Sequence, residues 1–222
     1  EWTPPPGGYR EKPQVELKSD CTAVALEPGV KSAAAAAPVP AAMWSDPASA
    51  PTLRVAYARD AGFILEAEVK DTRHMQPHSR ERLVEGDSLT FAFDVNKTDE
   101  WRANDIWMNY KGHNCVEYSV ALRADGKSEV FRRNCWIPDM KKFESVGANV
   151  RANVRHANGV TKYWVWIPWA NLGLDEQLKA GAKIGFAAVL YSSDGGEVKT
   201  NRLFGGIANP LDPMRYGVLE LK

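Results

Sequence analysis

The stretch from residue 88 to residue 95 alternates between two kinds of side chain at every position. One set is apolar and comprises Leu89, Phe91, Phe93 and Val95, and the other comprises Ser88, Thr90, Ala92 and Asp94. Successive side chains of a β-strand point to opposite faces, so this pattern predicts a strand with one dry face. Residues 163–167 alternate in the same way and end at Pro168, which cannot donate a hydrogen bond to a sheet. The chain is therefore expected to build β-sheet.

Further strand-like runs recur along most of the chain. They occupy residues 53–57, 63–69, 104–110, 116–123, 128–136, 150–155, 184–191 and 217–221. Asp125-Gly126 and Asn158-Gly159 supply hairpin turns between them, and only residues 172–178 suggest a short helical turn. Many short strands separated by turns are typical of sandwiches. We predict an all-β fold, an antiparallel β-sandwich with jelly-roll or immunoglobulin-like layers.

The first part of the chain differs from the rest and predicts an N-terminal extended arm. Pro and Gly dominate residues 2–13, alanines fill residues 33–37, and residues 15–26 contain one possible strand. We divide the chain into an arm, residues 1–43, that packs on a sandwich, residues 44–222. The alternation places Trp164 and Trp166 on the outer face of their strand, where two indoles would form a large exposed patch. Either the arm covers them, which we favour, or they bind a partner.

Composition narrows the class of protein. The 222 residues suit one large β domain, and 28 basic residues balance 28 acidic ones, which argues against nucleic-acid partners. No apolar run approaches the roughly 20 residues of a membrane span. Because the chain opens at Glu1 rather than Met, we expect a mature or excised form.

The three cysteines provide a test of the compartment. Pairing Ala124 with Lys127 across the Asp-Gly turn puts Cys115 opposite Trp136, and a one-residue bulge would put it opposite Cys135. We predict a Cys115–Cys135 disulfide, which would indicate an oxidising compartment, with two buried thiols as the alternative. Cys21 is left over.

Several motifs occur in a particular order. Glu85-Gly86-Asp87-Ser88 feeds a strand, Ile167-Pro168-Trp169 ends one, and Tyr216-Gly217-Val218-Leu219 comes last. Over residues 44–222 this order resembles the family-9 carbohydrate-binding modules of the DOMON-like β-sandwich superfamily. The resemblance implies a β-sandwich, non-catalytic sugar binding and structural calcium. It also implies two aromatic clamps for a terminal sugar, but Val84 and Pro210 stand at the matching positions, and neither can stack on a sugar.

Other residues can supply a sugar site. Asp105, Trp107 and Asn109 share one face of a predicted strand and combine an indole with a carboxylate and an amide. Trp101 is a candidate rim residue, and Arg82 and Arg202 complete the predicted ligand-binding set. The alternative is that Trp107 is core and Trp101 anchors its loop. Arg82 belongs to a basic loop, residues 73–82, that would suit anionic glycans or would be an ordinary solvated loop.

Oxygen-bearing side chains cluster at the end of the predicted strand at residues 88–95 and just after it. Asp94, Asn96 and Asp99 suit calcium, which accepts irregular oxygen coordination, although such residues are also common in turns. The four histidines show no zinc-binding spacing. No organic cofactor is expected.

These observations predict a non-catalytic, monomeric carbohydrate-binding domain of a secreted, periplasmic or cell-surface protein, attached to a glycoside hydrolase or lyase. Neither a nucleophile-elbow motif nor a phosphate loop is present. One alternative is a haem-binding DOMON-type domain, with Met108 and His113 or Met75 and His74 as axial ligands. Another is a scaffolding sandwich that has lost its sugar site.

Overall fold

The computed structural model describes residues 19–95, 114–137, 139–174, 177–207 and 211–222. Its strands are β1 (Cys21–Ala25), β2 (Thr52–Ala58), β3 (Gly62–Lys70), β4 (Ser88–Asp94), β5 (Cys115–Leu122), β6 (Ser128–Cys135), β7 (Glu144–Ser145), β8 (Arg151–Ala157), β9 (Val160–Pro168), β10 (Lys183–Ser193), β11 (Val198–Leu203) and β12 (Gly217–Leu221). Short 3-10 turns are η1 (Ala41–Met43), η2 (Pro47–Ser49), η3 (Arg80–Glu85), η5 (Trp169–Leu172) and η6 (Pro213–Arg215). The predicted all-β class is confirmed.

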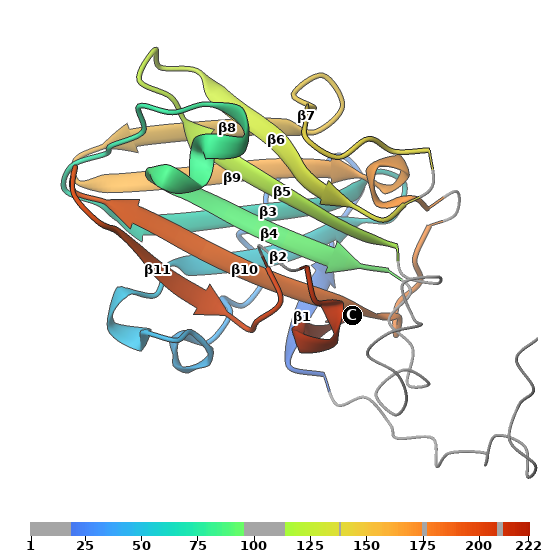
Figure 1. Cartoon of the computed structure of the whole chain (residues 1–222). Coiled ribbons are helices and arrows are strands. Elements are labelled where there is room, and N and C mark those ends of the chain that lie inside the picture. Colours follow the sequence, from blue (N-terminus) through green and yellow to red (C-terminus); the bar gives the residue numbers. More distant parts are fainter. Residues whose placement is uncertain (1–18, 96–113, 138, 175–176, 208–210) are drawn as a thin grey trace, which may run out of the picture.

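The strands form one curled sheet that folds into two layers. Its order is β7-β6-β5-β4-β10-β12-β1-β2-β3-β9-β8, and β11 pairs with β10. Figure 1 shows β4, β5, β6 and β10 in front of β2, β3, β8 and β9. Strand β1 connects the layers, because its first residues pair with β12 and its last residues pair with β2. Both of these pairings are parallel, so the sheet is mixed rather than purely antiparallel.

The two layers meet over an aromatic core. Phe63 of β3 stacks on Phe93 of β4 with ring centroids 4.9 Å apart, and both are fully buried. Trp169 of η5 packs edge-on against Phe63 at 5.0 Å. At the end of the strand order, the Val154 amide of β8 donates to Ser128 Oγ of β6 at 2.8 Å. This contact brings β8 close to the opposite layer.

Strand β4 departs from the predicted pattern because both of its faces are buried. Its apolar side faces the core as predicted. On the other side, Thr90 Oγ1 and Ser119 Oγ share a 2.6 Å hydrogen bond, and Ala92 packs in a second apolar cluster with Ala187 and Tyr216. Residues 204–207 and 211–216, which include Tyr216, therefore cover part of the outer face of this layer.

The N-terminal segment lies against the back layer. Leu26, Ala33 and Ala36 are buried with Ala56 and Ile64, and the half-buried Trp164 and Trp166 pack on this cluster. Trp164 Nε1 donates to the Lys31 carbonyl at 2.8 Å. The outward phase of the two tryptophans therefore agrees with the alternation, and residues 26–36 contact Trp164 and contribute to the cluster on which Trp166 packs.

The β5–β6 hairpin has a different register from the one used to predict a disulfide. Leu122 pairs with Ser128, which alone would bring Cys115 opposite Cys135. A bulge at Arg133 then shifts the register, so the Cys115 carbonyl accepts from the Trp136 amide at 2.9 Å. The structure holds Cys115 and Cys135 as thiols outside any disulfide, and the predicted bridge is not present in it.

Strands β7 and β11 were not predicted, and the predicted strand at residues 104–110 lies outside the described residues. The short turn expected at residues 172–178 begins earlier, as η5 at Trp169. Among the described residues, no helix has the length and apolar character required to cross a bilayer.

Candidate functional site

The outer face of β4, β5 and β10 carries a buried charged pair. Glu117 of β5 is fully buried, and its Oε1 accepts from Arg133 Nε at 3.1 Å. Arg133 is the extra residue of the β6 bulge, and bulges commonly re-aim a side chain. Its Nη1 also donates to the Glu81 carbonyl of η3 at 2.6 Å. The bulge thus places a guanidinium between the sheet and the turn that covers it.

Tyr191 of β10 belongs to the same region. Burial raises the pKa of its hydroxyl, and the Glu117 carboxylate raises that pKa further, whereas Arg133 and Arg202 lower it. The predicted ligand residue Arg202 pairs with Val189 of β10, which belongs to the apolar cluster of the same face. Val84 packs on the apolar cluster of the same face, as does Leu211. The first expected clamp position thus borders this face, and the second, Pro210, lies outside the described residues.

The other predicted ligand residues have separate outcomes. Arg82 is exposed and its Nη2 lies 2.6 Å from Glu85 Oε2, and this hydrogen bond is the main cause of the lowered pKa of Glu85. Trp101, Asp105, Trp107 and Asn109 lie outside the described residues. Of the predicted set, only Arg202 can therefore be placed at a hollow. It lines a cavity of about 600 Å³ together with Trp44, Phe204, Asp212 and Arg215.

Basic side chains of the loop at residues 73–82 lie close to carboxylates of this loop and of its flanks. His78 Nε2 lies 3.8 Å from Glu85 Oε2, and Arg80 Nε lies 3.9 Å from Glu81 Oε2. His74 Nδ1 lies 3.2 Å from Asp71 Oδ2. Two of the three arginines of this loop, Arg80 and Arg82, therefore already have carboxylate partners.

Cofactor and metal predictions are tested only in part. Asp94 ends β4 and is fully buried, whereas Asn96 and Asp99 lie outside the described residues, so the calcium site stays a prediction. Of the two haem ligand pairs, Met108 and His113 are also outside the described part. His74, in the other pair, has its Nε2 2.8 Å from the Leu122 carbonyl and its Nδ1 facing Asp71. Neither nitrogen is directed to an open haem pocket.

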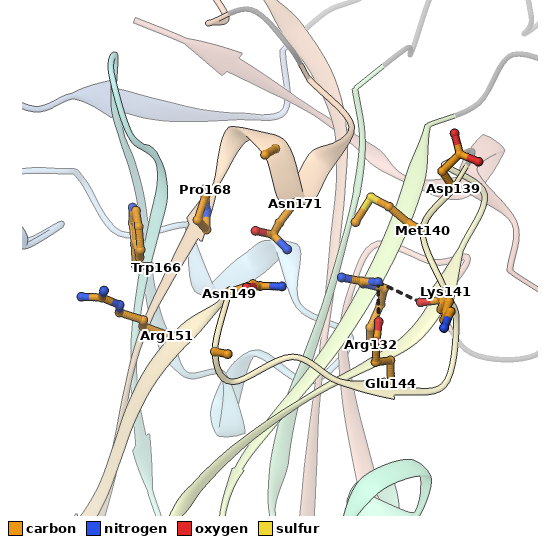
Figure 2. Close-up of a pocket in the computed structure, with 12 residues that line it drawn as sticks. Arg132, Asp139, Met140, Lys141, Glu144, Asn149, Arg151, Trp166, Pro168 and Asn171 are labelled. Atoms are coloured by element: carbon orange, nitrogen blue, oxygen red, sulfur yellow. Dashed lines mark hydrogen bonds and ion pairs between the residues drawn. The ribbon is translucent and has the colours of Figure 1, made fainter.

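Another hollow lies beside β8 and β9. It has a volume of about 660 Å³, and Figure 2 shows side chains from β6, β8, β9, η5 and the 139–149 loop around it. Trp166 forms one wall. The Arg151 guanidinium lies 5.3 Å from the centre of its ring, within cation–π range.

A buried arginine forms the opposite wall of this hollow. Arg132 Nη1 donates to the Lys141 carbonyl at 2.9 Å and to Glu144 Oε2 at 3.1 Å, as Figure 2 shows. Its guanidinium lies 5.9 Å from the Tyr118 ring, and the Tyr118 hydroxyl donates to the Asn171 carbonyl at 2.7 Å. These contacts fix the loop that closes the hollow against the end of β9.

Polar groups in this hollow are available to a ligand. Within the described part of the chain, the side-chain amides of Asn149 and Asn171 make no hydrogen bond, and neither does the indole N–H of Trp166. An indole beside two amides can offer a flat apolar surface together with donors and acceptors. The strand phase had predicted an outward Trp166, but Asn149, Arg151 and Asn171 gave no signal of their own.

Comparisons with known proteins identify the fold. No protein-family model matches the sequence, and no curated protein sequence matches it. A family-9 carbohydrate-binding module from Caldicellulosiruptor kristjanssonii in complex with cellotriose superposes with a TM-score of 0.60 and 14% identity, covering 91% of this chain and 93% of that chain. A family-9 module from the same organism in complex with glucose superposes with a TM-score of 0.53 and 14% identity, covering 81% of each chain. The protein therefore has the sandwich fold that the motif order predicted.

Proposed function

We propose that the protein is a non-catalytic carbohydrate-binding domain and that the hollow beside Trp166 receives a sugar ring. The observation that carries the proposal is the combination of an indole and two available amides in one open hollow, on a fold seen in modules solved with glucose and cellotriose. Its volume of about 660 Å³ falls within the roughly 300–1,000 Å³ typical of small-molecule sites.

The side chains of the hollow suggest how a sugar would be held. Pyranose C–H groups would lie on the Trp166 indole, whose orientation is fixed by the packing of Arg151. Hydroxyl groups would exchange hydrogen bonds with Asn149 and Asn171, which carry both donors and acceptors. Because Arg132 is already paired with Glu144, the remaining basic groups are Lys141 and Arg151, and a uronic sugar would bring a carboxylate to them.

A titration with variants tests this proposal. Glucose, cellotriose and a uronic trisaccharide are added to the protein with and without calcium, and binding is measured by calorimetry. Trp166→Ala should weaken binding about 30-fold, equivalent to the roughly 2 kcal/mol of a binding hot spot. Asn149→Ala should weaken it less. The matched control is Trp164→Ala, because Trp164 lies on the same strand and donates to Lys31 instead.

Two further variants address the ligand residues that were predicted from the sequence. If Trp107→Ala and Arg202→Ala abolish binding while Trp166→Ala does not, the carbohydrate function holds but its site is the one predicted from the sequence. If no sugar binds to the intact protein, the carbohydrate proposal is wrong and the scaffolding alternative replaces it.

The remaining expectations belong to the same proposal. We propose a secreted or cell-surface location, a monomeric state and attachment to a polysaccharide-degrading enzyme. We also propose a calcium ion at Asp94, Asn96 and Asp99, which a loss of thermal stability on adding a calcium chelator would support.

A further inference from the structure

One end of the sandwich brings together metal-binding side chains that are far apart in the sequence. Asp71 and His74 follow β3, and His156 lies near the end of β8. His74 Nδ1 is 3.2 Å from Asp71 Oδ2, and His156 Nδ1 is 3.7 Å from the same oxygen. All three ligand atoms lie within 4.8 Å of one another. This arrangement is independent of the Trp166 hollow and of the calcium prediction.

The hydrogen bonds of His74 set its orientation. Its Nε2 lies 2.8 Å from the Leu122 carbonyl oxygen, which can only accept, so Nε2 carries a proton. In a neutral imidazole this leaves a lone pair on Nδ1, the atom that faces Asp71 and His156. Histidines that bind metals commonly donate their other nitrogen to a backbone carbonyl in this way.

A second contact prepares the other ligands. Thr161 of β9 donates its one hydroxyl proton to Asp71 Oδ2 at 2.7 Å, so its oxygen accepts the 3.0 Å hydrogen bond from His156 Nδ1, and a metal ion would replace that Nδ1 proton. The two imidazoles stack with centroids 5.6 Å apart and an interplanar angle of 29°.

We propose that Asp71, His74 and His156 bind a divalent transition-metal ion of the zinc class. Ligand atoms at about 2.0–2.1 Å from a tetrahedral zinc ion lie about 3.3 Å from each other. The two nitrogen-to-oxygen separations of 3.2 and 3.7 Å are close to that value, and all three ligand atoms lie within 4.8 Å, so His156 would have to move toward the ion. Imidazole and carboxylate ligands are suited to this class of ion.

The surroundings offer an entry path and a fourth ligand. Asp71 and Asp87 line a cavity of about 190 Å³, whose charged side chains comprise four carboxylates and three basic groups. Asp87 Oδ2 lies 3.8 Å from His74 Nδ1, so either this oxygen or a water molecule can complete the coordination. A bound ion would join the loop after β3 to β8 and stabilise this end of the sandwich.

Metal titration of the untagged 222-residue chain tests the proposal. After treatment with a chelator, the protein is titrated with Zn²⁺, with Ca²⁺ as the comparison ion, and Co²⁺ is added to record its visible spectrum. One Zn²⁺ should bind per chain, and Co²⁺ should give the intense bands of tetrahedral coordination. The melting temperature should rise by roughly 5–10 °C at 100-fold excess over Kd.

Variants separate this site from adventitious binding. His74→Asn and His156→Ala should weaken zinc binding by about 100-fold or more, and Thr161→Val, an outer partner, by about 10-fold. Asp71→Asn keeps the side-chain shape and should also weaken binding if a histidine variant fails to fold. His78→Ala is the matched control, since His78 faces Glu85 outside the cluster. The absence of zinc uptake by the intact protein, or equal uptake by the Asp71→Asn and His156→Ala variants, would overturn the proposal.

Discussion

The stack of Phe63 on Phe93 is the clearest test of how the two layers are held together. Phe63 belongs to the back layer and Phe93 to the front layer, and both rings are fully buried. Replacing either by Leu removes three carbon atoms, and at about 0.8 kcal/mol per buried CH₂ this costs about 2.4 kcal/mol. For a domain of this length, the melting temperature should fall by about 5–10 °C.

A double-mutant cycle isolates the contact between the rings. If the stack contributes beyond the area it buries, Phe63→Leu and Phe93→Leu together should cost about 0.5–1.5 kcal/mol less than the sum of the single changes. The assay is urea unfolding followed by circular dichroism. Phe143→Leu is the matched control, because Phe143 is 53% exposed and the change should be nearly neutral. Single changes that are additive, or no more costly than Phe143→Leu, would refute the proposed packing.

Two more predictions follow from buried backbone and thiol positions. Gly62→Ala should lower the free energy of unfolding by at least about 3 kcal/mol, because the φ of Gly62 is +141° and a Cβ there would lie 1.9 Å from the Ile167 carbonyl oxygen. The control is Gly147→Ala, where a Cβ would have no atom within 4 Å and where urea unfolding should give a change of less than about 0.5 kcal/mol. Burial, and secondarily the charge of Asp20, raise the pKa of the Cys21 thiol from 9.0 to about 12, so alkylation at pH 8 should be about 10³-fold slower in native than in unfolded protein. Because the unfolded state loses this proton first, the contribution of Cys21 to the free energy of unfolding should be lost as pH rises from 9 to about 12. Cys21→Ala should remove that part of the pH dependence. The same pH dependence in the wild type and in Cys21→Ala would contradict the assignment.

Strand positions could be predicted from the sequence because side-chain alternation is a local property. The apolar face of β4 and the outward phase of Trp164 and Trp166 follow directly from it. Strand β11 escaped prediction because its alternation is weak: Asn201 is buried through hydrogen bonds to the chain around Asp46, not through apolar contact. Burial of the second face of β4 also escaped, since it depends on segments that pack over it.

Register was less predictable than strand position. The hairpin around Asp125-Gly126 was expected, but neither its starting pair nor the bulge at Arg133 is encoded by a local pattern. These two shifts cancel each other, so Cys115 faces Trp136 after all. A disulfide argument that depends on one residue of register therefore requires the bulge to be known.

Clusters formed by distant residues could not be predicted at all. The spacing of the four histidines gives no reason to group His74, which lies in the loop after β3, with its structural neighbour His156 of β8. The same applies to the Trp166 hollow, in which Asn149 and Asn171 come from the two sides of β8 and β9. Sequence spacing identifies metal or ligand sites only when their members share one element.

The two tryptophans of β9 show how covering one face can leave a site beside it. The sequence offered two alternatives for both, cover by the N-terminal segment or binding to a partner. The indole N–H of Trp164 donates to the Lys31 carbonyl, so residues 26–36 supply the hydrogen-bond partner of this side chain. Trp166 packs on the same cluster but also borders the hollows of about 660 and 230 Å³, with its N–H available among the described residues. The N-terminal segment thereby covers Trp164 and leaves Trp166 at the rim of the hollow, where a ligand can reach it.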